Sequence, residues 1–322
     1  MPVLPMAAEQ AHAYTYRHRD QRSMADADQA EVLALKRGSA LVDEGVYDDL
    51  VAEALDDFEN SPDEAIRLEF HGRDLAEDNG TGAVMELVQD RAKRLGDLYP
   101  FTLTDNQLVH KGADVGWYEF MLACSVQRDI SSKPFNRLPQ LFERISSQVT
   151  TRLLGEGASA LHVGHPRDPE LSAFKAGFER LHDLTGEWPW KPADDLPPDG
   201  LATGDDGLDF VAWRRAGGGR HGSIYLFGQC ACGDDWHGKL TELTVEKIAM
   251  WTGGGEKWAV TPIRLFATSH VLADGWYIKD QKAAGLLLDR IRLRLLESGT
   301  LILPSAVHAE MVEITRSTLS LN

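Results

Sequence analysis

The sequence of 322 residues is poor in cysteine and has no long hydrophobic run. Its three cysteines are too few, and odd in number, for a disulfide framework, which favours a reducing compartment. The longest apolar stretches, such as residues 283–288, are far shorter than the ~20 residues that span a bilayer. The first ten residues lack a basic segment followed by an apolar one, so we expect no secretion signal. These deficits predict a soluble cytoplasmic protein with no membrane partner.

Basic residues are also scarce, with 33 Lys and Arg against 50 Asp and Glu, giving a net charge of −17. This balance at first argues against a nucleic-acid partner. The excess is local, however, because residues 41–80, here called the acidic block, hold 14 acidic side chains and two arginines, a net charge of −12. We expect the acidic block to be a solvated face or a surface for a protein partner or self-association. Nucleic acid therefore stays open as a ligand for the rest of the chain.

The hydrophobic pattern predicts two domains. Residues 1–98 have apolar side chains at three-to-four spacing and are expected to form an acidic, mainly helical accessory module. Residues 99–322 mix both periods, which indicates an α/β core. There we expect strands over 101–108, 208–213, 223–232 and 263–268, and helices over 117–126, 141–154, 171–184, 236–251 and 282–297.

The common catalytic signatures are missing from this core. It has no Gly-rich phosphate loop ending in Gly-Lys-Ser/Thr, no Gly-x-Ser-x-Gly elbow and no His-Glu-x-x-His helix. The expected hairpin over 208–232 is more informative. Asp209 begins its first strand, and Gln229 lies inside its apolar second strand. A buried amide costs roughly 1–3 kcal/mol unless it is hydrogen-bonded. We therefore expect a polar partner for Gln229, with Asp209 as the natural candidate.

This pairing of Gly207–Trp213 with a strand ending in Gln229-x-Ala231 resembles the catalytic hairpin of the PD-(D/E)xK nucleases, which have the restriction-endonuclease-like fold. The resemblance covers roughly residues 100–300 and implies a mixed sheet flanked by helices. It implies catalytic roles for Glu143 on the first core helix, for Asp209 and for Gln229. The family usually has a lysine where this chain has Ala231. Some members carry that lysine on the following helix, where Lys239 is placed.

The resemblance also implies a metal and a substrate. Glu143, Asp209, Gln229 and the backbone carbonyl of Cys230 would hold Mg²⁺ or Mn²⁺. Lys239 would orient the attacking water or offset charge on the phosphate. The implied activity is that of an Mg²⁺-dependent endonuclease acting on DNA, or on RNA, as a bacterial restriction or antiviral-defence component.

Each of these residues also has an ordinary interpretation. Asp209 could end a turn, Gln229 could face water on an edge strand, Glu143 could lie on a solvated face, and Lys239 could pair with Asp235.

Other side chains near the hairpin leave further alternatives open. Cys230 and Cys232 alternate with Gln229, so they are expected to be small buried side chains on the opposite face, although a zinc or redox site with Asp234 or His237 is a further alternative. His162 and His165 could contact phosphate or lie in a surface loop. For the whole chain, the alternative function is a non-catalytic interaction or sensor protein with a degenerate nuclease fold. Ala231 and the net charge favour that alternative.

Overall fold

The computed structural model describes residues 6–43, 81–112, 114–165, 171, 173–192, 207–253, 258–297 and 303–321, with side chains described from Arg22 onward. Nearly all of the acidic block lies outside the described residues. None of the helices in the described part of the chain is long and apolar enough to cross a membrane.

The chain forms two compact units. The first comprises Met1–Val126, Val271–Trp276 and Thr315–Asn322, and the second comprises Gln127–His270 and Tyr277–Ile314. Residues 99–126, which the sequence analysis grouped with the second domain, therefore belong to the first unit. They do so because their two strands form a sheet with a strand at residues 39–41.

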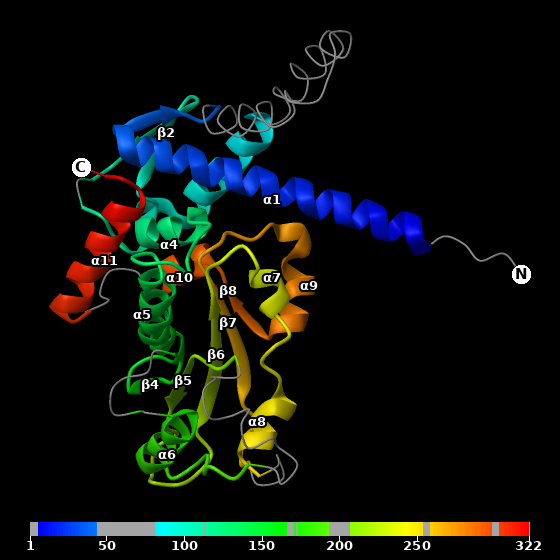
Figure 1. Ribbon diagram of the computed structural model, residues 1–322, viewed down its shortest axis with the longest axis vertical. Helices are drawn as coiled ribbons and strands as arrows, with labels where there is room; N and C mark the ends of the chain where they lie inside the picture. The colour runs from blue at the N-terminus through cyan, green and yellow to red at the C-terminus, as the bar shows by residue number, and fades with distance from the viewer. Residues whose placement is uncertain are drawn as a thin grey trace, which may run out of the picture. The chain divides into compact units, whose positions relative to one another are not determined.

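The first unit contains the helical N-terminal region that the sequence predicts, together with a small antiparallel sheet (Figure 1). Its elements are α1 (Met6–Arg37), β1 (Ser39–Leu41), a helix over 81–95, the 3₁₀ helix η1 (Gly96–Leu98), β2 (Phe101–Thr104), β3 (Gln107–His110) and α4 (Trp117–Val126). The order in the sheet is β1-β3-β2. The helix over 117–126 has the bounds that the sequence analysis predicts.

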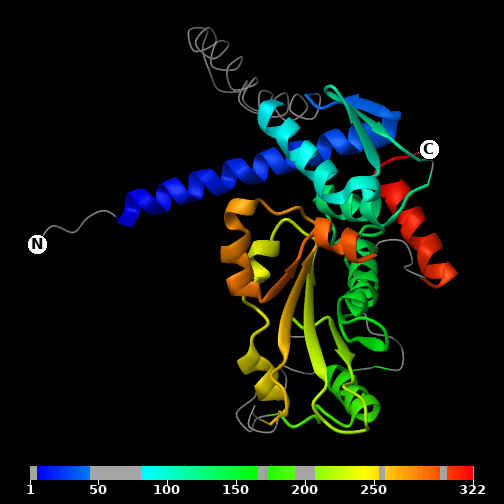
Figure 2. The ribbon, with the colours of Figure 1, turned by 180° about the vertical axis from the view of Figure 1, so that it is seen from behind.

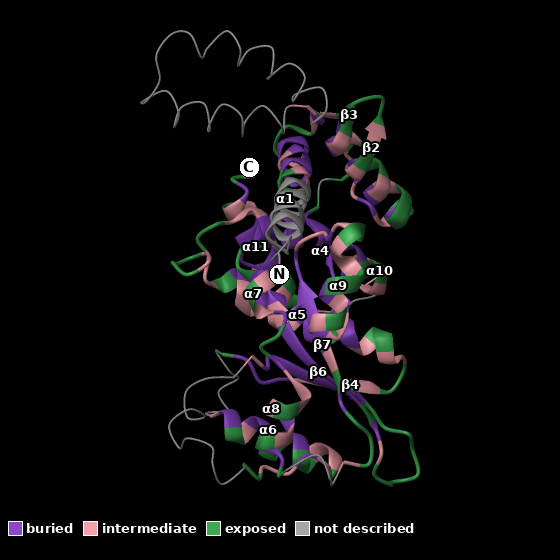
Figure 3. Cartoon of the chain, turned by 90° about the vertical axis from the view of Figure 1, so that its right-hand side faces the viewer, coloured by how far each residue is buried: buried purple, intermediate pink, exposed green. Residues whose placement is uncertain are grey.

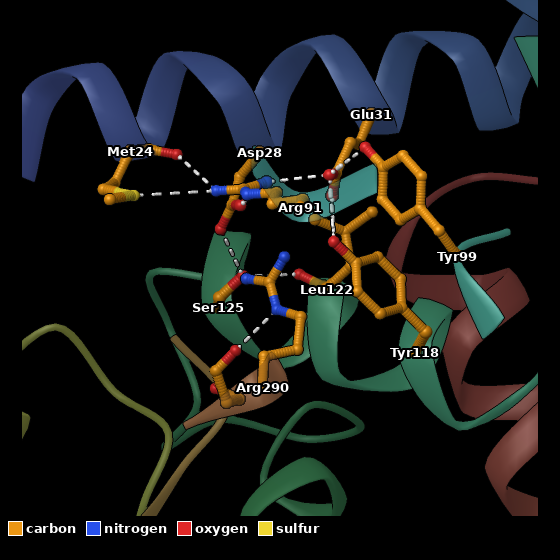
Figure 4. A network of polar contacts seen from close by, with 10 residues as sticks. Met24, Asp28, Glu31, Arg91, Tyr99, Tyr118, Leu122, Ser125 and Arg290 are labelled. Atoms are coloured by element: carbon orange, nitrogen blue, oxygen red, sulfur yellow. Dashed lines mark hydrogen bonds and ion pairs between the residues drawn. The ribbon is translucent and has the colours of Figure 1, made fainter. Parts of the chain in front are cut away.

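A buried ionic network holds the helices of this unit together (Figure 4). The guanidinium of Arg91 lies 2.8 Å from Asp28 and 2.8 Å from Glu31, both of which are on α1. Tyr99 and Tyr118 donate their hydroxyls to Glu31. The two carboxylates raise the pKa of Arg91 despite its burial. Such a network is costly to disturb because removal of one charge leaves the others buried without compensation.

The second unit is a five-stranded mixed sheet flanked by helices (Figures 1 and 2). The strands lie in the order β4 (Ala158–His162), β5 (Phe210–Arg214), β6 (Ile224–Ala231), β7 (Ile263–Thr268) and β8 (Leu286–Leu288). The first three are antiparallel, and β7 and β8 run parallel to β6. The remaining helices are α5 (Arg137–Leu154), α6 (Phe174–Thr185), α7 (Trp236–Lys239), α8 (Val245–Trp251), α9 (Asp274–Ala284), α10 (Arg290–Glu297) and α11 (Ser305–Thr318).

Both faces of the central strands are covered, and β6 and β7 are mostly buried (Figure 3). Helix α5 packs on β4, β5 and β6. The other face carries an aromatic core in which Phe227 of β6 packs with Phe178 of α6 and Trp188. Side chains alternate between the faces along a strand. Neighbouring side chains of β6 therefore point to opposite faces of the sheet, one covered by α5 and the other by the aromatic core.

Two expected helices and one expected strand are wrong, and one strand was missed. The strand expected over 101–108 is two antiparallel strands, β2 and β3, joined at residues 105–106. The helix expected over 236–251 is broken into α7 and α8, because Thr244 caps α8 by accepting a hydrogen bond from the Lys247 amide. The helix expected over 282–297 is interrupted by β8. Gly285 has φ +89°, and a Cβ there would lie 2.5 Å from the Arg264 carbonyl oxygen, so the chain turns at this glycine and enters the sheet. The strand β4, whose sequence Ala-Ser-Ala-Leu-His has little β-propensity, was not anticipated.

Candidate active site

Asp209 is held in place by two neighbouring segments of the second unit, β6 and the residues that follow β4. It directly precedes β5, and its amide donates to the Gly228 carbonyl at 2.9 Å. Its own carbonyl accepts hydrogen bonds from the amides of Val163 and Gly164, at 2.7 and 2.8 Å. Its carboxylate oxygen Oδ2 accepts the Cys230 amide at 2.6 Å. The residue is buried, so these bonds fix both its backbone and the direction of its side chain.

Glu143 reaches the same place from helix α5. Its Oε2 lies 3.1 Å from Nε2 of His162, the last residue of β4. A Cβ placed on Gly164 would lie 2.7 Å from Oε2 of Glu143 and 3.0 Å from Oδ1 of Asp209. The carboxylates of Glu143 and Asp209 therefore converge beside Gly164. The side chain of Glu143 is only 13% exposed, which excludes the solvated-face interpretation.

Cys230 is partly buried and lies near this pair of carboxylates. Burial, together with the nearby charges of Asp209 and Glu143, raises the pKa of its thiol well above the ordinary value. The Cys230 group that contacts Asp209 is its amide N–H. The role of its backbone carbonyl as a metal ligand stays a prediction.

Gln229 has a different partner from the one expected. Its side chain is buried, so it does not face water, and its Nε2 donates to Oε2 of Glu242 at 2.6 Å. The expectation that Asp209 pairs with this amide is wrong, because the Asp209 side chain accepts the Cys230 amide. Glu242 lies between α7 and α8. The amide of Gln229 is thus directed toward the α7–α8 segment.

Lys239 forms the ordinary contact that the sequence also allows. Its Nζ lies 3.6 Å from Oδ2 of Asp235, one helical turn earlier, and its side chain is 35% exposed. Within the described part of the chain, it makes no hydrogen bond or ion pair with Asp209 or Gln229. Its catalytic role stays a prediction.

Sequence reasoning missed three contributors, His162, Gly164 and Glu242. His162 was considered only as a phosphate contact or a loop residue, because the strand that it ends was not recognised. The sequence of residues 158–162 has little β-propensity and carries no clear signal for that strand. Glu242 carried no signal, since it was placed inside a continuous helix.

The two converging carboxylates are suited to a hard divalent cation. No group of three or more His, Cys, Asp and Glu side chains is placed to hold a metal among the residues that the structure describes. Mg²⁺ does not require such a group, because it is usually bound by one or two carboxylates, with waters and substrate phosphates completing its octahedron. Glu143 and Asp209 provide this pair.

The fold and the site thus define a mixed α/β protein with a carboxylate pair beside its central hairpin. No family model matches the chain, and no curated protein matches it. Among solved structures, the MspJI restriction endonuclease in complex with a 27-mer oligonucleotide aligns at 14% identity and a TM-score of 0.25. The alignment covers 56% of this chain and 32% of that one, so the chain spans about a third of the length of the protein that it matches.

Proposed function

We propose that this protein is a metal-dependent nuclease that hydrolyses phosphodiester bonds in DNA, or in RNA. The observation that carries the proposal is the convergence of the Glu143 and Asp209 carboxylates beside Gly164. These are the two positions at which the resemblance to PD-(D/E)xK nucleases implies an acid on the first core helix and an acid at the hairpin.

Neighbouring groups of the protein orient the Glu143 and Asp209 carboxylates as a cation site would require. Glu143 and Asp209 would hold Mg²⁺ or Mn²⁺, which when bound supplies a Lewis acid for the scissile phosphate. His162 contacts Glu143, and the Cys230 amide donates to Asp209, so both carboxylates are oriented by hydrogen-bonding groups of the protein. We propose that Gln229 adds a neutral oxygen to the same site.

Lys239 is proposed to act on the attacking water or on the charge that develops on the phosphate. Its ion pair with Asp235 would have to open first. The Asp235 side chain is 72% exposed, and exposed ion pairs contribute only ~0–1 kcal/mol, so a substrate phosphate can compete for the ammonium group.

The direct test is incubation of the purified chain with plasmid, linear DNA and RNA in the presence of Mg²⁺, Mn²⁺ or EDTA. We expect cleavage that requires the metal and is lost in Glu143→Gln and Asp209→Asn. Asp183→Asn is the matched control, because Asp183 is exposed on α6, away from the carboxylate pair. Cleavage that persists in a folded Asp209→Asn protein would contradict the proposal.

The second candidate is a non-catalytic interaction or sensor protein with a degenerate nuclease fold. Two contacts favour it, since Gln229 is bonded to Glu242 and Lys239 is paired with Asp235. Nucleic-acid binding that is unaffected by EDTA, with no cleavage by the wild-type chain, would favour this alternative.

The biological setting that we propose for the nuclease is bacterial restriction or antiviral defence in the cytoplasm. The acidic block is proposed to bind a protein partner or a second copy of the chain, since its charge would repel a phosphate backbone. Replacing the Asp and Glu side chains of the acidic block by Asn and Gln in the full chain should therefore disturb assembly, as measured by light scattering.

A further inference from the structure

The hydrogen bond between Gln229 and Glu242 fixes the orientation of a buried amide. Gln229 is 4% exposed on β6, whereas Glu242 lies at the surface. The bond runs from Nε2 of Gln229 to Oε2 of Glu242 at 2.6 Å. A carboxylate can only accept hydrogen bonds, so the nitrogen end of the amide must face Glu242. Its oxygen, Oε1, consequently faces away from Glu242.

The residue Gln229 lies on β6 next to the hairpin position of Asp209, whose amide donates to the Gly228 carbonyl. Phe210 pairs with Gly228 in the antiparallel register, which places Asp209 opposite Gln229. Gly207 lies beside the amide nitrogen of Gln229, because a Cβ on Gly207 would lie 3.2 Å from Nε2 of Gln229. Among the described residues, Oε1 of Gln229 accepts no hydrogen bond. A neutral oxygen is thus left available on the hairpin that carries Asp209.

We propose that Glu242 is a positioning residue that holds Gln229 with its amide oxygen available as a metal ligand. The inference rests on the proposed function. Glu242 also keeps a negative charge beside position 229, where the family often has a carboxylate and this chain has an amide. Glu242 would act through Gln229, to which it is hydrogen-bonded, rather than by contacting the metal itself.

The test exchanges the two side chains. In the metal-free protein at neutral pH, Gln229→Glu places two carboxylates within hydrogen-bond distance, so we expect a lower Tm than that of the wild type. In the double variant with Gln229→Glu and Glu242→Gln, the amide at 242 can donate to the carboxylate at 229, and the Tm should return toward the wild-type value. Glu156→Gln is the matched control, since Glu156 is exposed in the same unit and should leave the Tm unchanged.

Titration with Mg²⁺, followed by calorimetry, separates positioning from a purely structural role. The amide introduced by Glu242→Gln can either donate or accept, so Gln229 is free to turn. We expect about tenfold weaker Mg²⁺ binding, the scale found when a residue that orients a ligand is lost. The double variant, with a carboxylate at 229, should bind Mg²⁺ at least as tightly as the wild type.

Two results would overturn the inference: wild-type Mg²⁺ affinity in Glu242→Gln, or a double variant no more stable than Gln229→Glu alone. A wild-type protein that binds no Mg²⁺ would instead refute the proposed function and the metal part of the inference with it. The Tm values of the four proteins would still decide whether Glu242 holds the amide.

Discussion

Gly164 offers the sharpest perturbation of the carboxylate pair, because its missing side chain is what lets the two acids approach. In Gly164→Ala, the new Cβ would lie 2.7 Å from Oε2 of Glu143, 3.0 Å from Oδ1 of Asp209 and 3.2 Å from Cα of Asp209. The φ angle of Gly164 is outside the left-handed region, so alanine adds no backbone strain there. The effect of the substitution comes from these contacts alone.

The magnitude follows from the distances. Ordinary non-bonded contact needs about 3.5 Å, so Oε2 of Glu143 must recede by roughly 0.8 Å. That movement acts against its contact with His162 at 3.1 Å, and the backbone of Asp209 is held by its own hydrogen bonds. Overpacking of this kind costs ~1–3 kcal/mol of folding free energy. A displacement near 1 Å at a reacting centre can lower turnover by ~100-fold.

The assay measures metal-dependent plasmid cleavage and the urea-unfolding free energy of Gly164→Ala. We expect cleavage to fall by two orders of magnitude while most of the stability remains. Gly238→Ala is the matched control, because nothing lies within 4 Å of a Cβ at that exposed position on α7. Wild-type cleavage and Mg²⁺ affinity in a folded Gly164→Ala protein would refute the conclusion that these carboxylates form the site.

Four further variants test individual contacts. Asp209→Asn should abolish cleavage with little loss of stability, whereas Asp209→Ala should also lose about 1–3 kcal/mol in urea unfolding, because the Cys230 amide loses its acceptor; equal stability of the two variants would contradict this. Arg91→Met should lower the unfolding free energy by ~3–5 kcal/mol, since Asp28 and Glu31 stay buried without a cation, and a loss below ~1 kcal/mol would show that the network is not a buried ionic one. Burial, and then the charge of Asp289, raises the pKa of Tyr277 from 10.0 to about 12. A raised folded-state pKa favours the folded protein below pH 10, and this contribution is lost as the pH rises from 10 toward 12. The difference in unfolding free energy between wild type and Tyr277→Phe should therefore be constant below pH 10 and fall above it, and a flat difference up to pH 12 would contradict the assignment.

The strands at the centre of the second unit could be predicted because their sequences are continuous apolar runs of strand length. The strand β7 has the expected bounds, Ile263–Thr268, and β5 and β6 lie within two residues of theirs. Buried central strands carry this signal because both of their faces meet hydrophobic layers.

The edges of the same sheet could not be predicted from local pattern. The three leucines of β8 occur next to helical sequence, and only pairing with β7 makes them a strand. The short strand β4 depends in the same way on its ladder with β5. Such elements are determined by tertiary contacts, which override weak local propensity.

The candidate site likewise contains residues that the sequence could identify and contacts that only the tertiary structure determines. The pattern identified Asp209, and the resemblance identified Glu143, whose carboxylate does lie beside that of Asp209. The resemblance could not indicate that Gln229 bonds to Glu242, because this contact depends on the break between α7 and α8. Side-chain partners across the sheet follow from where the helices end, and these ends were the least predictable feature.

The carboxylate pair itself is an argument for a cation. Two acidic side chains converge in a largely buried place, where like charges repel and desolvation penalises both. His162 and the Cys230 amide offset part of this cost. A local arrangement that works against folding is expected where function requires it. The proposed binding of a divalent ion would account for two oxygen-donating carboxylates at this position.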